Sequence, residues 1–367
     1  MSCNESCTAA TAVPALILLS TLKGTDMRSE TNIKLRTGDC VQVKSAAEIA
    51  DTLDRNGMLD GLPFMPEMLE FCGQHARVGR RAEKTCVEFP GGGYKIREFV
   101  NNNTVVLEGL RCSGAHHDGC ERGCMIFWKS DWLHKADSDE TGKSLAIYET
   151  AALRGKMKTM SSPDHYICQS TELAKATKAM TRGRILVKCL ADIRSGSRGI
   201  LEMIRLIAVP AWRKATRKIS RPRLVGNLKR TPVGNLGLQP GEWVTVRPAS
   251  EIAKTLDQRG RNRGLSCDFG MANHSGEKFR VRQRLDRMIS EATGEMRRVD
   301  ATVILEGSNC TCANVVGGCP RQDFVYWREI WLKRIQVDPN LDSELSSSSD
   351  PTGEQSPMTQ SQSEVHV

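Results

Sequence analysis

The sequence has few aromatic residues and no long apolar run. Aromatic side chains account for 5% of its 367 residues. The most apolar stretch, residues 12–22, is much shorter than the ~20 residues that cross a bilayer, and Pro14 interrupts it. No Lys or Arg precedes this stretch, so the positively charged start of an export signal is missing. These features favour a cytoplasmic location, with at most a peripheral attachment to a membrane.

The sequence also lacks the common catalytic signatures. It has no GxxxxGK[ST] phosphate loop, no GxGxxG at a strand–helix junction and no HExxH zinc motif. Function therefore has to be inferred from charge, repetition and cysteine spacing. These patterns leave open whether the protein is an enzyme.

Positive charge is concentrated in the middle of the chain. The net charge is +9, and residues 151–230 carry +15, so the remainder carries −6. This pattern predicts an anionic partner: a biosynthetic protein, a membrane surface or a nucleic acid. The alternative is a solvated basic surface without a partner. The candidate anion-binding residues are Arg213, Lys214, Arg217, Lys218, Arg221 and Arg223.

The chain contains an internal duplication. Residues 38–62 and 241–265 are identical at 13 of 25 positions with a constant offset of 203. The match resumes at 107–109 and 305–307, and it ends in FWKSDWL (127–133) and YWREIWL (326–332). Two copies of one module, separated by the basic segment, follow from this repetition.

Each copy has the pattern of a small β-rich module. Alternating valines at its start predict a half-buried strand, and the next stretch predicts a short helix, capped by Ser45 in the first copy. Residues 279–289 and 296–307 predict a strand pair around a turn at 292–294. The tryptophan pairs 128/132 and 327/331 fit closure of each core better than base or sugar stacking.

The predicted class is α+β, with two antiparallel SH3-like or similar small-barrel modules joined by a basic, partly helical connector. Residues 200–223 predict an amphipathic helix that Pro210 kinks or ends. Its apolar face would pack between the modules or lie on an anionic membrane. The expected divisions are a poorly ordered segment 1–37, module 1 at 38–135, the connector at 136–235, module 2 at 236–336 and a disordered tail at 337–367.

Cysteine is unusually abundant, with 14 residues, and three cysteines fall between positions 112 and 124. Four thiolates can hold tetrahedral zinc or an iron–sulfur cluster. The C-x7-C-x3-C spacing matches neither two zinc knuckles nor a ferredoxin run. Reduced structural thiols and a redox-active disulfide are the remaining interpretations. The candidate metal ligands are Cys86, Cys112, His117, Cys120 and Cys124.

The second copy keeps part of this set. Cys310 corresponds to Cys112 and Cys319 to Cys120, whereas Asp323 stands in the position of Cys124 and Ile289 in that of Cys86. A second candidate site would use Cys310, Cys312 and Cys319. The loop of the second copy contains no histidine, so the first copy is better equipped to bind a metal.

Two further readings concern single cysteines. Cys120 and His117 could form a nucleophile–base pair, although their closeness in sequence says little about geometry. Cys168 either completes or neighbours the first-copy site, or it is an ordinary buried thiol.

The repeated GDCVQVKSAAEIADTLDRNGMLDGLPFMPEMLEFCG segment, the RCSGAHHDGCERGCMIFWKSDWL loop, YICQSTEL and YWREIWLKRI together resemble an uncharacterised bacterial family of duplicated, cysteine-rich proteins. The resemblance runs from about Gly38 to Ile335. Members tend to occur among genes for polysaccharide or secondary-metabolite biosynthesis, which implies an accessory or enzymatic role there. They usually carry a Cys–His–Cys loop in the second copy too, and this chain does not.

Together these patterns predict a metal-binding accessory or scaffold protein, with structural zinc in the first module and an anionic partner. The resemblance implies that this role belongs to polysaccharide biosynthesis. One alternative is an enzyme that uses an iron–sulfur cluster or catalytic zinc at the same cysteines. The other is a nucleic-acid-binding protein that uses the basic connector.

Overall fold

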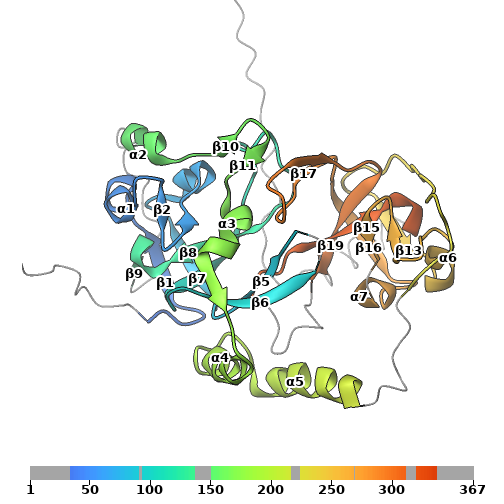
Figure 1. The fold of residues 1–367 in the computed structure, drawn as a ribbon, viewed down its shortest axis with the longest axis horizontal. Helices are drawn as coiled ribbons and strands as arrows, with labels where there is room; N and C mark the ends of the chain where they lie inside the picture. The colour runs from blue at the N-terminus through green and yellow to red at the C-terminus, as the bar shows by residue number, and fades with distance from the viewer. Residues whose placement is uncertain are drawn as a thin grey trace, which may run out of the picture. The chain divides into compact units, whose positions relative to one another are not determined.

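The computed structural model describes residues 34–90, 93–136, 150–215, 224–267, 269–310 and 320–336. Within these ranges the chain is a mixture of helices and antiparallel strands, and the β-rich parts fall into two modules (Figure 1). This confirms the predicted α+β class at the level of two β-rich modules. The segment expected to be poorly ordered at the start and the tail after residue 336 lie outside the described residues, except for residues 34–37.

The first module is built on a five-stranded antiparallel sheet with the order β8-β7-β4-β1-β9. A single 3-10 turn, η2 (Ser130–Trp132), separates its last two strands along the chain. The strands are β1 (Cys40–Val43), β4 (His75–Arg81), β7 (Thr104–Arg111), β8 (Met125–Lys129) and β9 (Leu133–Lys135).

The second module repeats this sheet in the order β20-β19-β16-β13-β21, with the 3-10 turn η5 (Glu329–Trp331) in the same place. The register repeats as well, since Cys40 pairs with Arg77 and Trp243 pairs with Arg280, both shifted by 203 residues. The duplication is therefore confirmed in three dimensions. The strands are β13 (Trp243–Val246), β16 (Lys278–Arg284), β19 (Thr302–Asn309), β20 (Phe324–Arg328) and β21 (Leu332–Arg334).

A short helix follows the first strand of each module: α1 (Ala46–Thr52) and α6 (Ala249–Ala253). Ser45 forms the predicted cap of α1, a capping box with Glu48 that satisfies a free amide at the start of the helix. Each helix is tied to a core tryptophan. The indole of Trp132 donates to Thr52 at 3.1 Å, and the indole of Trp331 donates to Thr255 at 3.0 Å.

All four repeated tryptophans are fully buried, as expected for core closure: Trp128, Trp132, Trp327 and Trp331. A void left by any of these side chains would be costly, because protein cores are close-packed.

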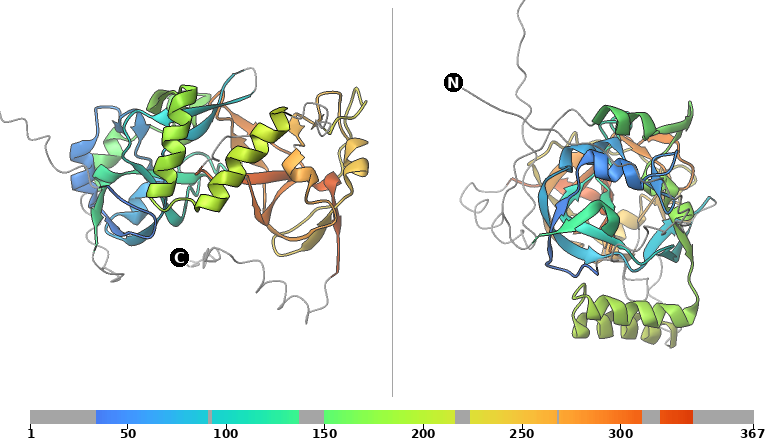
Figure 2. Two further views of the ribbon diagram at one scale, coloured as in Figure 1. Left: turned by 90° about the horizontal axis from the view of Figure 1, so that it is seen from below. Right: turned by 90° about the vertical axis from the view of Figure 1, so that its left-hand side faces the viewer.

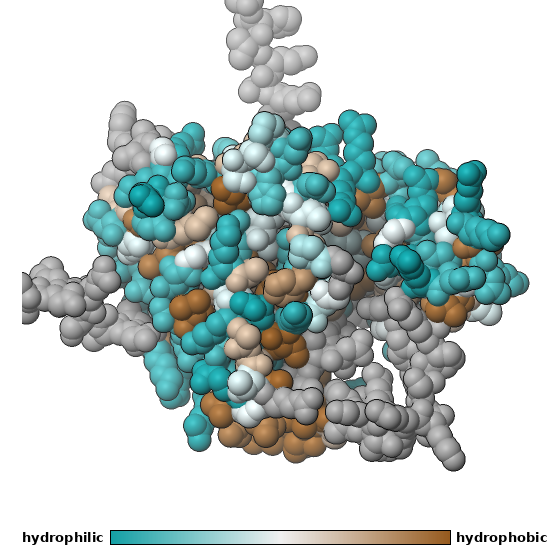
Figure 3. All heavy atoms as spheres, in the orientation of Figure 1, coloured by the Kyte–Doolittle hydropathy of each residue, from teal (hydrophilic) through white to brown (hydrophobic). Residues whose placement is uncertain are grey.

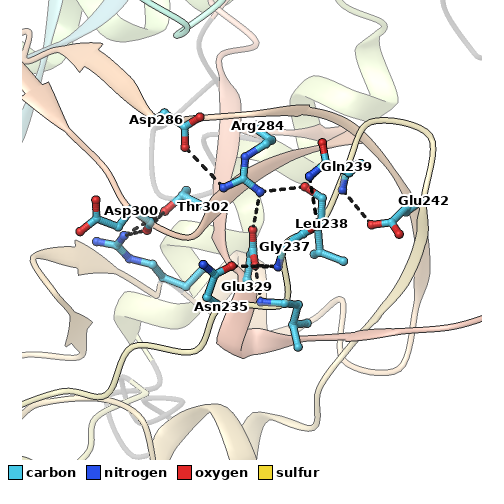
Figure 4. A network of polar contacts seen from close by, with 12 residues as sticks. Asn235, Gly237, Leu238, Gln239, Glu242, Arg284, Asp286, Asp300, Thr302 and Glu329 are labelled. Atoms are coloured by element: carbon cyan, nitrogen blue, oxygen red, sulfur yellow. Dashed lines mark hydrogen bonds and ion pairs between the residues drawn. The ribbon is translucent and has the colours of Figure 1, made fainter.

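The second module is braced by a buried carboxylate at the start of η5. Glu329 accepts hydrogen bonds from the amide of Gly237 at 2.8 Å and from Arg284 at 2.9 Å (Figure 4). Arg284 also donates to the carbonyl of Leu238 at 2.8 Å. These contacts fix the segment that leads into β13.

Each module also has a hairpin outside its main sheet. In module 1 this is β5 (Thr85–Glu88) with β6 (Tyr94–Phe99), and in module 2 it is β17 (Arg287–Ile289) with β18 (Met296–Arg298). The predicted strand at 279–289 is therefore interrupted near residue 285, and its second part pairs locally around the expected turn. Smaller pieces are β2 (Met58–Leu59), β3 (Leu62–Pro63), η1 (Pro66–Phe71), β14 (Arg261–Asn262), β15 (Leu265–Ser266) and α7 (Phe269–Ala272).

The middle of the chain is mainly helical. Its strand β12 extends the hairpin of module 1, because it pairs with β6. The elements are α2 (Thr150–Lys156), β10 (Met160–Ser162), β11 (His165–Tyr166), α3 (Gln169–Ala176), β12 (Thr177–Ala179), α4 (Arg182–Arg194) and α5 (Ile200–Ala215).

For α5 the sequence left two outcomes open at Pro210, a kink or an end, and two for its apolar face, packing between the modules or lying on a membrane. The helix does not end at Pro210 but continues to Ala215, since one missing backbone donor can be tolerated when the turns on either side persist. Its apolar face is not buried between the modules either, because Ile200, Leu201 and Ile204 are 64%, 82% and 57% exposed. Among the described residues, no helix is long and apolar enough to span a membrane.

Candidate metal centre

Four cysteines from two distant segments line one cavity of about 30 Å³. Three of them, Cys112, Cys120 and Cys124, come from the loop between β7 and β8, and Cys168 comes from the start of α3. The rest of the wall is largely apolar, and it includes Met65, Met125, Phe127 and Ile289. The structure therefore brings Cys168 to the predicted cysteine cluster, which spacing along the chain left undecided.

The loop folds tightly around a glycine. The carbonyl of Gly114 accepts from the amides of His117 and Gly119, at 3.0 and 3.1 Å. Gly114 has a φ of +70°, and a Cβ there would lie 2.0 Å from the carbonyl oxygen of Cys120. A residue with a side chain cannot occupy this position, because both the conformation and the space exclude it. The turn thereby brings Cys120 back toward Cys112.

Cys168 is positioned by a clamp between α3 and β8. The side chain of Gln169 accepts from the amide of Phe127 and donates to its carbonyl, both at 2.8 Å. Gln169 is buried, so these bonds are shielded from water. Because Gln169 follows Cys168 and Phe127 lies three residues after Cys124, the clamp holds the two cysteine segments side by side.

Module 2 completes the wall through a reciprocal contact with module 1. Arg122 donates to the carbonyl of Ile289 at 3.1 Å, and Arg321 donates to the carbonyl of Cys86 at 3.0 Å. Arg122 and Arg321 hold equivalent places in the two loops, each six residues before the repeated tryptophan at 128 or 327. Cys86 and Ile289 are related by the offset of 203. The two copies thus contact each other as in an isologous dimer.

The same backbone hydrogen bond closes the cysteine loop in both modules. The amide of Cys112 donates to the carbonyl of Cys124 at 2.9 Å, and that of Cys310 donates to Asp323 at 2.7 Å. These bonds agree with the correspondence drawn from the sequence. Where module 1 has the thiol of Cys124, module 2 has a carboxylate that pairs with Arg321 at 2.9 Å.

Among the described residues that line the cavity, three have cationic side chains and none has a carboxylate. The cations are His117, Arg122 and Arg321. Their counter-charges lie behind the wall, where Glu291 binds Arg321 at 2.8 Å and lies 3.6 Å from Arg122. The wall therefore presents cationic groups, whose charge Glu67, Glu291 and Asp323 balance from outside the lining.

His117 is held through both ring nitrogens. Its Nδ1 lies 2.6 Å from a carboxylate oxygen of Glu67, and its Nε2 lies 2.9 Å from the carbonyl of Ile167. Burial alone would lower the pKa of His117, but the hydrogen bond and the charge of Glu67 outweigh it and raise the pKa. An imidazolium that donates to both acceptors follows. In this arrangement His117 contributes charge to the cavity wall, with neither nitrogen directed to a metal.

Without a metal, three of the four cavity thiols are poor nucleophiles. Burial raises the pKa of the Cys112 and Cys120 thiols, and it raises that of Cys168 to about 12. Reactive cysteines have a lowered pKa, so these thiols are neutral and inert at pH 7. His117 is occupied by Glu67 and Ile167, so the arrangement gives no support to the Cys120–His117 nucleophile pair.

The other candidates fall in different places. Cys86 is buried in β5 and does not belong to the described wall of the cavity. Cys310 follows β19, whereas Cys312 and Cys319 lie outside the described residues. Arg213 and Lys214 are in the last turn of α5. The remaining anion-binding candidates, Arg217, Lys218, Arg221 and Arg223, lie outside the described residues.

Across the described ranges, no three Cys, His, Asp or Glu side chains are grouped so that they could hold a metal ion as they stand. Cys112, Cys120, Cys124 and Cys168 are free thiols. Sequence reasoning also missed Arg321 as part of the site, although its equivalence to Arg122 in the duplication was a readable signal.

Comparison of the chain with protein-family models, with curated proteins and with solved structures gave no match.

Proposed function

We propose that the protein is a metalloprotein in which Cys112, Cys120, Cys124 and Cys168 ligate an iron–sulfur cluster where its two modules meet. The observation that carries the proposal is the four-cysteine cavity with its cationic wall. Four cysteine thiolates are the ligand set of [2Fe–2S] and [4Fe–4S] clusters. Compared with the set predicted from sequence, Cys168 replaces Cys86 and His117.

The cavity leaves a small space beside the four cysteines. In a closed zinc site each sulfur lies about 2.3 Å from the metal, which leaves no room for a water-sized sphere between the ligands. This cavity admits such spheres over about 30 Å³. Side chains would have to move inward for a zinc ion and outward for a cluster, and the same four thiolates serve either. Structural zinc is the second candidate, because it uses the same four thiolates.

The electrostatics fit as well. Four thiolates with inorganic sulfide carry net negative charge, and the described wall presents His117, Arg122 and Arg321, whose carboxylate partners Glu67, Glu291 and Asp323 are not among its lining residues. Buried cations near the sulfurs stabilise such a cluster, and they also tune its reduction potential. The thiols must lose their protons on binding, so assembly releases protons and is favoured by rising pH.

The role that this geometry supports is structural. Four protein ligands leave no open coordination position for a substrate, which sets the site apart from catalytic zinc centres. The cluster would join the module 1 loop to α3, beside Ile289 and Arg321 of module 2. We therefore favour a scaffold protein whose modules are fixed by a metal centre over an enzyme that reacts at the metal.

We also infer that each module is an SH3-like barrel. Four strands follow one another across each sheet, and a 3-10 turn leads to a fifth strand beside the first. This is the arrangement of a small SH3-like barrel. Its edges and loops serve as binding surfaces in many unrelated proteins, which agrees with a scaffold role.

The test is metal and sulfide analysis of the full chain purified without oxygen, with a visible absorption spectrum. We expect iron and acid-labile sulfide in equal amounts and a broad visible band. Cys168→Ser should lose most of both. Cys86→Ser is the matched control, because Cys86 is also buried and was predicted from sequence but lies off the cavity wall; it should keep the cluster.

Three results would decide against the proposal. Zinc without iron, lost in Cys168→Ser, would leave a four-thiolate site but replace the cluster by a structural ion. Loss of metal in Cys86→Ser with retention in Cys168→Ser would restore the ligand set predicted from sequence. Absence of any metal in freshly isolated and in iron- and sulfide-reconstituted protein would refute a metal centre.

A further inference from the structure

Helix α4 buries charged side chains against the protein and exposes apolar side chains to solvent. Two of its charged side chains are buried against module 1: Lys188 binds Glu83 at 2.9 Å, and Asp192 forms an ion pair with Lys84. All four side chains are at most 6% exposed. The opposite face carries Leu186, Val187 and Leu190, which are 56%, 60% and 54% exposed. A helix of a soluble protein normally does the reverse.

This orientation is firmly fixed. Lys188 also lies 3.8 Å from Glu98. Arg184, from the same helix, forms an ion pair with Glu98 at 2.7 Å. Glu98 is buried in β6. Removing one partner of such a buried set leaves an unpaired charge, so rotation of α4 to bury its leucines is strongly opposed.

The next helix extends the same apolar surface. Ile200, Leu201 and Ile204 of α5 are more than half exposed. Helical spacing places these residues on one face, as it does the exposed residues of α4. Six of the ten large hydrophobic side chains that the described residues expose belong to this pair. In Figures 1 and 2 the two helices lie outside the five-stranded sheets, and Figure 3 shows hydrophobic residues gathered where they lie.

Positive charge accompanies this surface. Residues 182–215 contain eight Lys and Arg against two Asp and Glu, a net charge of +6. Arg194 and Arg205 are exposed beside the apolar residues. At 16 residues, α5 is too short to cross a bilayer, and no described helix can do so. An exposed apolar face bordered by Arg and Lys is the pattern of a helix that lies in the plane of an anionic membrane.

We propose that the α4–α5 pair docks on an anionic lipid bilayer, with its leucine and isoleucine face entering the headgroup–acyl boundary and its arginines contacting acidic headgroups. This surface is separate from the cysteine cavity, so the proposal does not rest on the metal centre. Of the three anionic partners predicted from sequence, a biosynthetic protein, a membrane surface and a nucleic acid, it selects the membrane surface. Burial of this face in the bilayer would cover the apolar surface that α4 leaves open.

The experiment is flotation of the full chain with vesicles of phosphatidylcholine alone or with 30% phosphatidylglycerol, at low and at high salt. We expect binding to the anionic vesicles at low salt, at least tenfold weaker binding to neutral vesicles, and loss at high salt because screening weakens the attraction. Leu190→Asn/Leu201→Asn should weaken binding by roughly tenfold or more for each leucine removed.

Val233→Asn is the matched control, because Val233 is an equally exposed apolar residue, at 58%, outside the helix pair. It should bind like the unaltered protein. Both variants change exposed side chains, so circular dichroism should show unchanged folding. Equal binding of the double variant and the control would overturn the proposal, as would equal binding to neutral and anionic vesicles. Absence of binding to any vesicle would also overturn it, and a dimer that the double variant abolishes would then assign the face to a second copy of the chain.

Discussion

Glu291 should be the most sensitive single position in the contact between the modules. It is 2% exposed at its side chain, binds Arg321 at 3.1 and 2.8 Å, and lies 3.6 Å from Arg122. It also accepts from the amide of Glu88 at 2.9 Å. Glu291→Gln keeps the shape but leaves two buried guanidinium groups with less counter-charge. We expect the free energy of unfolding to fall by about 3 kcal/mol, the low end for breaking a buried pair.

The assay is urea unfolding at pH 7, followed by circular dichroism. With a slope of about 3 kcal/mol per molar urea, the midpoint should fall by about 1 M. Glu277→Gln is the control, because Glu277 forms an exposed ion pair with His274 and is 54% exposed; it should cost less than about 0.5 kcal/mol. Equal losses for the two variants would refute the claim that the arginine–Glu291 contact holds the modules together.

The same position gives a pH dependence of known sign. Burial would raise the pKa of Glu291, but the charges of Arg321 and Arg122 outweigh it and lower the pKa. A carboxyl with a depressed folded pKa stabilises the protein fully above its unfolded value, about 4.3, and loses that effect as the pH falls through the folded value. The difference between the unaltered protein and Glu291→Gln should therefore be full at pH 7 and shrink in acid. A constant difference from pH 7 to 3 would contradict this assignment.

Two further variants test the capping box of α1 and the buried ion pairs of α4. Ser45→Ala removes the capping box with Glu48 and should cost about 1 kcal/mol in the same unfolding assay; no loss would show that the cap is dispensable. Lys188→Met leaves buried Glu83 with Arg81 as its remaining cation and should cost up to about 3 kcal/mol, whereas Lys135→Met, at a side chain 54% exposed and 3.6 Å from Asp39, should cost less than about 0.5 kcal/mol. Similar small losses for both lysines would show that the charged face of α4 does not anchor it.

The modules could be predicted from sequence because their signals are local and appear twice. The valine alternation, the Ser45 cap and the tryptophan pairs all describe short-range structure, and the duplication supports each of them. The interruption of the strand at 279–289 was missed, because alternation alone does not show where a strand changes its partner.

The site was only partly predictable for the opposite reason. Cys112, Cys120 and Cys124 were found because they share one loop, whereas Cys168 reaches the cavity through the fold of α3 and the Gln169 clamp. No spacing rule links positions 44 residues apart. Arg321 comes from the other module altogether.

The burial of charged side chains by α4 could not be foreseen either. Helical periodicity shows that a helix has an apolar and a charged face, but the usual assumption places the apolar face inward. Here the partners of the charged face are Glu83, Lys84 and Glu98, buried residues of module 1 that lie about 100 residues earlier in the chain. Such pairings become visible only when the elements are folded together.

The most direct test of the central claim is X-ray absorption at the iron edge on the full chain, purified without oxygen. The proposal predicts iron surrounded by sulfur, with a second shell of neighbouring iron, and loss of both shells in Cys168→Ser. A signal at the zinc edge alone, with a single shell of four sulfurs, would contradict the cluster and identify the site as a structural zinc centre.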